Sequence, residues 1–168
     1  MYNRFYLNRR PRKTPVYNAT QRDYDFMKNW RVVRYYIQKR YELSMAELEM
    51  LLYLYDENVF DKELFNEFSR SMSWDKERFQ EMCDRGFFKL WRKGKRAKHK
   101  QLYELSHQAK IICSHTYKKL LGLELISENP YRNSIMKGES YTDKIYRNLI
   151  KKMNQKTTID SHIDEELL

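Results

Sequence analysis

The chain has 168 residues, a net charge of +10, 41% hydrophobic and 15% aromatic residues, and only 4 Gly and 3 Pro. This length suits one domain with extensions, and the scarcity of Gly and Pro disfavours a turn-rich all-β fold and favours helices. No apolar run approaches the length of a membrane span, so we expect no membrane partner.

The charged residues are unevenly distributed along the chain. Residues 1–40 hold 11 Lys or Arg and 2 Asp or Glu, and residues 86–120 hold 10 and 1. Residues 41–85, between them, hold 5 Lys or Arg and 12 Asp or Glu. Two basic blocks therefore flank an acidic one, and any affinity for the phosphates of a nucleic acid is expected to reside mainly in the basic blocks.

Residues 1–20 are expected to form an extended basic arm, because Pro11 and Pro15 restrict their own backbone and that of the preceding residue. Its candidate binding residues are Arg9, Arg10, Arg12 and Lys13. Such a segment can follow the minor groove of DNA. It can equally clamp an acidic surface, on a partner or on this chain, and the sequence leaves both alternatives open.

Two helices are predicted next, at 22–41 and 44–55. The first has an apolar stripe with helical spacing, made by Phe26, Trp30, Val33 and Ile37. The second begins with Ser44-Met-Ala-Glu47, a capping box in which the Ser oxygen and the Glu carboxylate accept hydrogen bonds from free backbone N–H groups.

Residues 61–106 follow the order helix, turn, helix, β-hairpin. The spacing predicts helices at 61–70 and 73–85, with Asp61 and Ser73 as N-caps and Gly86 as the stop of the second helix. Residues 87–92 and 101–105 then alternate as strands around a basic turn. This is the order of a winged helix-turn-helix, a unit that commonly places one helix and the hairpin, or wing, against nucleic acid.

Over residues 44–122 the chain resembles the MarR-type winged-helix transcription regulators. Arg85-Gly86-Phe87-Phe88 stands where that family has a Lys-Gly-Leu-Ile step into the wing, and Leu102-Tyr-Glu-Leu-Ser106, with Ala109, is similar to the family's exit from the wing. The wing differs, because Lys95-Arg96-Ala97 replaces the family's usual Asp-Arg-Arg. The resemblance implies a DNA-binding regulator whose terminal helices form a dimer, here through residues 22–41, 106–121 and 140–153.

The wing supplies the main candidate nucleic-acid-binding residues. Its five cations within eight residues are Lys93, Lys95, Arg96, Lys98 and Lys100. Cations on a hairpin displace condensed counterions from a phosphate backbone, and Arg96 could enter a minor groove, where the potential is most negative. The alternative is a solvated basic loop or a contact with protein.

The second helix of the pair is a poorer candidate for reading bases. Lys76, Arg78 and Gln80 could reach bases or phosphates. Four carboxylates stand among them, at Asp75, Glu77, Glu81 and Asp84. Because a phosphate backbone repels carboxylates, we expect binding to depend on the wing more than on this helix, with low sequence specificity.

The remainder of the chain is predicted to be helical at both ends of a connector. Ser106 is expected to cap a helix that ends near Leu121, at Gly122. A connector at 123–139, a final helix at 140–153 and a frayed acidic tail follow. The expected organisation is an arm at 1–20, a winged-helix domain with its N-terminal helix at 21–122, and a connector, C-terminal helix and tail at 123–168.

The sequence gives little support for catalysis. No Gly-rich phosphate loop, nucleophile motif or zinc-spaced ligand set is present, so we expect no enzyme activity, no cofactor and no metal. Cys83 and Cys113 are expected to be buried thiols in a reducing compartment such as the cytoplasm.

Two interpretations compete. The first is a mainly α, dimeric winged-helix regulator that binds double-stranded DNA. The second is a non-enzymatic structural or adaptor component of a larger assembly, such as a virus particle, in which another protein covers the same apolar surfaces. The acidic helix block and the long terminal extensions favour the second interpretation.

Overall fold

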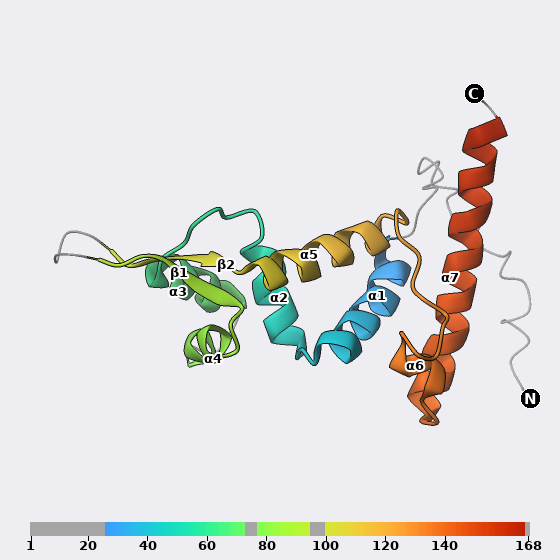
Figure 1. The fold of residues 1–168 in the computed structure, drawn as a ribbon, viewed down its shortest axis with the longest axis horizontal. Helices are drawn as coiled ribbons and strands as arrows, with labels where there is room; N and C mark the ends of the chain where they lie inside the picture. Colours follow the sequence, from blue (N-terminus) through green and yellow to red (C-terminus); the bar gives the residue numbers. More distant parts are fainter. Residues whose placement is uncertain (1–25, 73–76, 95–99, 167–168) are drawn as a thin grey trace, which may run out of the picture.

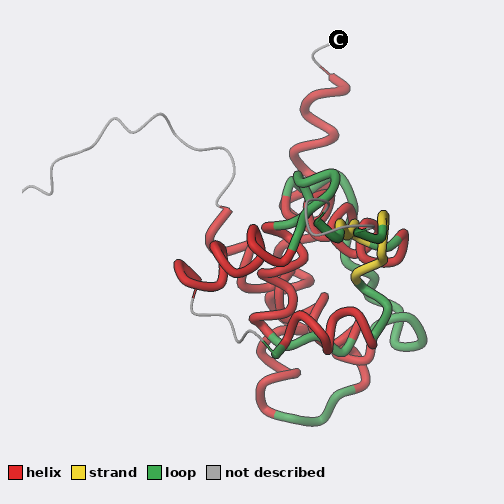
Figure 2. The backbone as a smooth tube through the Cα atoms, turned by 90° about the vertical axis from the view of Figure 1, so that its left-hand side faces the viewer, coloured by secondary structure: helices red, strands yellow, loops and turns green. Residues whose placement is uncertain are grey.

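The computed structural model describes residues 26–72, 77–94 and 100–166, which form seven helices and a two-stranded antiparallel sheet (Figure 1). Helices make up most of the backbone, as Figure 2 shows from a second direction. The prediction of a mainly α protein with one small hairpin and flanking helices is therefore confirmed. The arm at 1–20 lies outside the described residues.

Helices α1 (Phe26–Tyr41) and α2 (Met45–Tyr53) lie where the apolar spacing predicted them. Val33 and Ile37 of α1 are fully buried. The predicted capping box of α2 is present, because Ser44 Oγ accepts from Glu47 N at 3.3 Å and the Glu47 carboxylate accepts from Ser44 N at 2.6 Å. A turn with Glu42 at φ 53° joins the two helices.

Helices α3 (Lys62–Met72) and α4 (Arg78–Asp84) are the predicted pair. Asp61 caps α3, with its Oδ1 2.9 Å from Leu64 N. The predicted cap at Ser73 lies outside the described residues. Gly86, two residues after the end of α4, has φ +75°, and the N–H groups of Gly86 and Phe87 donate to Cys83 O and Met82 O, both at 2.9 Å. This is a Schellman end, which glycine adopts without strain.

The hairpin consists of β1 (Phe88–Arg92) and β2 (Leu102–Leu105). Phe60 extends this sheet by one bridge, because Phe60 and Tyr103 exchange backbone hydrogen bonds at 2.9 and 2.8 Å. An aromatic cluster joins the hairpin to α3 and α4, with ring centroids 4.9–6.5 Å apart. Its members are Phe60, Phe65, Phe79, Phe88 and Tyr103.

Helix α5 (His107–Leu120) packs against α1 and α2 and continues the same hydrophobic core. Ser106 Oγ accepts from Ala109 N at 3.3 Å, and Gly122 follows the helix at φ +75°, so both predicted ends are confirmed. Cys113 is buried and donates to Leu51 O at 3.4 Å.

The C-terminal part differs from the prediction. The connector contains a short helix, α6 (Ser134–Lys137). The last helix, α7 (Tyr141–Glu166), continues well beyond residue 153, so the prediction of a frayed tail was wrong. Residues 154–166 contain no Gly or Pro that would stop a helix. Asn154 also anchors the middle of α7, since its amide accepts from Ile126 N at 3.2 Å and donates to Ile126 O at 2.9 Å. The end of α7 projects beyond the other elements (Figures 1 and 2).

The first half of α7 packs on α1 within the chain. Tyr35 stacks on Tyr146 with centroids 3.9 Å apart, and its hydroxyl donates to Asp143 at 2.9 Å. Ile150 is fully buried. The two helices therefore contact each other within one chain, whereas the family resemblance favoured pairing across two chains. On another side of α7, Tyr141, Ile145 and Leu149 are exposed.

Candidate nucleic-acid interface

Three exposed cations lie on strand β1 or directly after it: Lys89 and Arg92 on the strand and Lys93 as the next residue. Within the part of the chain that the structure describes, no carboxylate lies within 4.0 Å of their charged groups. Lys89 does face Glu104 across the ladder, but that carboxylate lies 3.4 Å from Lys110 Nζ. The cations of β1 are therefore open to solvent and to a polyanionic partner.

A β-bulge alters the hairpin at Trp91. Leu90 pairs with Tyr103 and Arg92 pairs with Leu102, so Trp91 has no partner in the ladder. Its indole is 53% exposed, and the Arg92 guanidinium lies 5.5 Å from the ring centroid. A bulge can turn a side chain toward a ligand, so an exposed aromatic ring stands among the cations of the hairpin.

The tip of the wing and the arm lie outside the described residues. This applies to Lys95, Arg96 and Lys98 of the wing and to the four cations of the arm, Arg9, Arg10, Arg12 and Lys13. Lys100, which follows the tip, binds the carboxylate of Glu63 and lies 3.3 Å from Asp61 Oδ2. The hydrogen bond to Glu63 and the one to Asp61 raise the pKa of Lys100. Lys100 thus attaches the hairpin to the start of α3.

Helix α4 presents mainly carboxylates to solvent. Glu77, Glu81 and Asp84 are exposed. Arg78 donates to Ser44 Oγ at 3.1 Å and Gln80 donates to Asp84 Oδ1 at 2.8 Å, so both predicted contact residues are held within the chain. Lys76 lies outside the described residues. The structure does not bring Arg78 and Gln80 together with the cations of the hairpin.

An ion pair fixes the end of α4 to α2. The Arg85 guanidinium binds the carboxylate of Glu47, donates to Glu42 O at 2.9 Å and lies 4.9 Å from the centroid of the Phe87 ring. Glu47 is buried. Burial raises the pKa of Glu47, but the hydrogen bonds from Ser44 and Arg85 outweigh it and hold that pKa below its ordinary value. The orientation of α4 is thereby set by contacts with α2.

Three of the exposed groups, Lys89, Trp91 and Arg92, were missed by the sequence interpretation, which concentrated on the turn. The alternation of residues 87–92 contained the signal, since Phe88 and Leu90 fall on one side of a strand and Lys89 and Trp91 on the other. The bulge at Trp91 has no such signal, because it depends on the partner strand.

The described residues offer few groups for metal binding or for thiol chemistry. They contain no group of three or more His, Cys, Asp or Glu side chains placed to hold a metal ion. Burial raises the pKa of Cys113 to about 12, which keeps its thiol protonated. Among the described helices, none is both long enough and apolar enough to cross a membrane.

The chain matches no family model, no curated protein and no solved structure.

Proposed function

We propose that the protein is a winged-helix nucleic-acid-binding protein that holds double-stranded DNA mainly through its basic hairpin. The observation that carries this proposal is the set of exposed cations at β1 (Lys89, Arg92 and the following Lys93), which have no carboxylate partner among the described residues and lie next to an exposed Trp91. The order α2, α3, α4, β1, β2 and the bridge at Phe60 support the winged-helix assignment. A role in transcription regulation, as in MarR-type proteins, goes with this proposal.

In this proposal the wing and α4 have different roles. The wing contacts phosphates and a groove, and α4 supports the hairpin through the aromatic cluster. Helix α4 is poorly suited to reading bases, because Arg78 and Gln80 are hydrogen-bonded within the chain and its exposed carboxylates would face the phosphates. Contacts with backbone and groove shape give affinity with little sequence specificity.

A salt titration of DNA binding tests the proposal. Replacing Lys95, Arg96 and Lys98 with Ala removes three cations of the tip and should lower the slope of log Kd against log salt by roughly two to three. The matched control removes three exposed lysines far along the chain from the wing, Lys118, Lys151 and Lys152. A slope that changes equally in both variants, or in neither, contradicts binding through the wing.

A second candidate function is that of an adaptor or structural component of a larger assembly. The exposed carboxylates of α4 favour it, as does a set of exposed apolar side chains after α5: Leu121, Leu123 and Leu125. In that case wing and arm contact protein, and DNA binding is absent even at low salt.

The MarR-like proposal includes a homodimer, but only part of α7 is free to form its interface. The side of α7 that packs on α1 is covered, and Tyr141, Ile145 and Leu149 remain available. Light scattering on the wild type and on the variant Ile145→Asp plus Leu149→Asp tests this surface. A wild type that is monomeric at tens of micromolar contradicts the dimer.

A further inference from the structure

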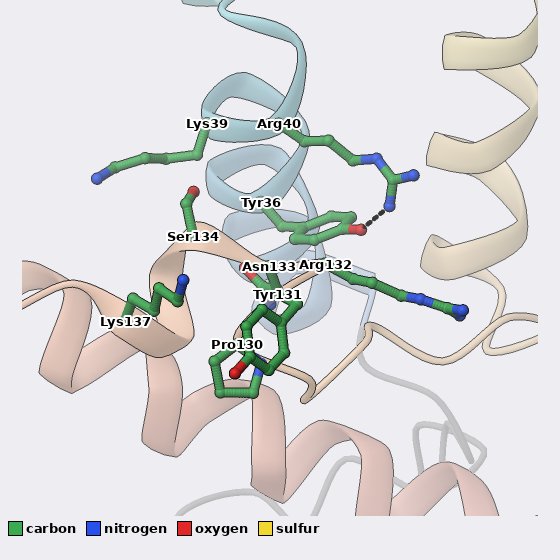
Figure 3. Close-up of a pocket in the computed structure, with 9 residues that line it drawn as sticks. All are labelled: Tyr36, Lys39, Arg40, Pro130, Tyr131, Arg132, Asn133, Ser134 and Lys137. Atoms are coloured by element: carbon green, nitrogen blue, oxygen red, sulfur yellow. Dashed lines mark hydrogen bonds between the residues drawn. The ribbon is translucent and has the colours of Figure 1, made fainter.

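A pocket of about 370 Å³ lies between the second half of α1 and the segment that leads into α6 (Figure 3). Four of its lining side chains are cationic and none is a carboxylate. The cations come from two walls: Lys39 and Arg40 lie on α1, whereas Arg132 precedes α6 and Lys137 is its last residue. A hollow with this lining favours an anion that is large enough to contact both walls.

The walls of the pocket are fixed by buried side chains. Tyr36 is 1% exposed and its hydroxyl is bound by the Arg40 guanidinium. Asn133 is 2% exposed, and its amide accepts from Ile135 N at 3.1 Å and donates to Ser127 O at 2.8 Å. These contacts hold the backbone on both sides before any ligand arrives, which reduces the entropy lost on binding.

The positive charge of the pocket is only partly neutralised within the chain. Lys39 lies 3.3 Å from Asp143 Oδ1. For Arg40, Arg132 and Lys137, no carboxylate of the described residues lies within 4.0 Å. The hydrogen bond to Tyr36 raises the pKa of Arg40 above its already high ordinary value, so its charge persists at any physiological pH. These three groups are therefore available to a bound anion.

An exposed aromatic ring stands beside the cations. The Tyr131 side chain is 88% exposed, and Lys137 Nζ lies 4.9 Å from the centroid of its ring. A tyrosine ring that is open to solvent next to Lys and Arg provides a surface on which a nucleobase can stack while its phosphates meet the cations.

We propose that this pocket binds a nucleotide, with its phosphates between Arg40, Arg132 and Lys137 and its base on Tyr131. The nucleotide is either free in solution or part of a single strand, since both carry the same phosphate and base. The site is separate from the hairpin, because α1 and α6 lie at the other end of the molecule from the wing (Figure 1). It therefore does not depend on DNA binding by the wing.

Isothermal titration calorimetry on the full chain tests the proposal with three probes: ATP, sodium pyrophosphate and a short oligothymidylate. We expect ATP or the oligonucleotide to bind more tightly than pyrophosphate. Arg132→Ala plus Lys137→Ala should weaken binding of every probe by roughly tenfold or more. Tyr131→Ala should weaken ATP or the oligonucleotide by roughly five- to a hundredfold and leave pyrophosphate unchanged.

The control variant, Lys151→Ala plus Lys152→Ala, removes the same charge from exposed positions on α7 and should bind as the wild type does. Thermal melting checks that each variant is folded, and the exposed positions of Arg132, Lys137 and Tyr131 make a loss of fold unexpected. Preference for ATP identifies a free nucleotide, and preference for the oligonucleotide identifies a strand. Absence of binding by all three probes at millimolar concentration, or an equal loss in the control, overturns the site. Pyrophosphate binding as tight as that of ATP and insensitive to Tyr131 overturns the assignment to a nucleotide.

Discussion

Helix α4 and strand β1 are neighbours in the sequence, yet their cations differ in whether they are bound within the chain or exposed to solvent. The basic side chains at α4 are bound within the chain: Arg78 to Ser44 and Arg85 to Glu47. Those of β1 project into solvent without a carboxylate partner among the described residues. A phosphate that approached α4 would have to displace internal contacts and pass exposed carboxylates, whereas at β1 it would displace only water and counterions.

In the proposed mode of binding, α4 is therefore a supporting helix. Its apolar side, with Phe79 and Met82, is buried against α3 and the hairpin. Its C-terminal end is attached to α2 by Arg85. These contacts set the direction in which the hairpin leaves the body, so the position of the basic strand depends on the structure of the acidic helix.

The largest effect on stability is expected from removing the ring of Phe79, which joins α4 to the hairpin. Phe79 is 4% exposed and lies within 4.9–6.5 Å, centroid to centroid, of four other rings. Phe79→Ala leaves a cavity there and should lower the free energy of unfolding by about 3–5 kcal/mol. Urea denaturation followed by circular dichroism measures this, with Tyr131→Ala, at an 88% exposed ring, as the control. A similar loss of stability in both variants would show that the aromatic cluster does not join α4 to the hairpin.

A smaller effect is expected from Arg85→Ala, which leaves the buried Glu47 carboxylate without its cation. Because the Arg85 side chain is 37% exposed, the loss should be about 1–3 kcal/mol, below that for a fully buried pair. The pKa of Glu47 is lowered in the folded protein, so its stabilising contribution is present above its ordinary pKa of 4.5 and is lost as the pH falls below that value. Urea midpoints across this pH range should fall less steeply for Glu47→Gln than for the wild type, and equal slopes would contradict this role.

Local signals in the sequence predicted most of the elements correctly. The capping box at Ser44, the cap at Ser106 and the stop at Gly86 depend on residues within a few positions of each other. Ser140 caps α7 in the same way, because its Oγ accepts from Asp143 N at 3.0 Å. Periodicity and caps are properties of one segment, so they can be read without knowing what that segment packs against.

The contacts that decide the candidate sites were not predictable in this way. Lys100 meets Glu63, Arg85 meets Glu47 and Lys39 meets Asp143 across 37 to 104 residues of sequence. These long-range pairs decide which cations remain exposed. The composition of the sequence cannot show this, because it counts bound and exposed cations alike. The pocket beside Tyr131 was missed for the same reason, because its two walls come from segments about ninety residues apart.

A moderate effect on DNA affinity is expected from the strand cations. Replacing Lys89, Arg92 and Lys93 with Ala should weaken DNA binding by roughly tenfold at low salt and lower the salt slope by roughly two to three. Fluorescence anisotropy with a labelled duplex measures both quantities. The same control as for the tip, at Lys118, Lys151 and Lys152, separates a local effect from a change in net charge. If only the tip variant responds, the strand is a support and the contact is confined to the tip.

The smallest effect is expected at α4 and gives the sharpest test of the comparison. Arg78→Ala plus Gln80→Ala removes the two described side chains that could read bases, but both are hydrogen-bonded within the chain, to Ser44 and Asp84. Because the chain itself holds these side chains, their loss should change DNA affinity by less than about twofold. Side chains that read bases would instead contribute roughly 1–3 kcal/mol of discrimination. Selection from random duplexes should yield little consensus with either protein, since contacts to phosphates carry no sequence information. A long consensus that disappears in the variant would show that α4 turns these side chains toward DNA when it binds. The opposition between α4 and β1 would then hold only for the free protein.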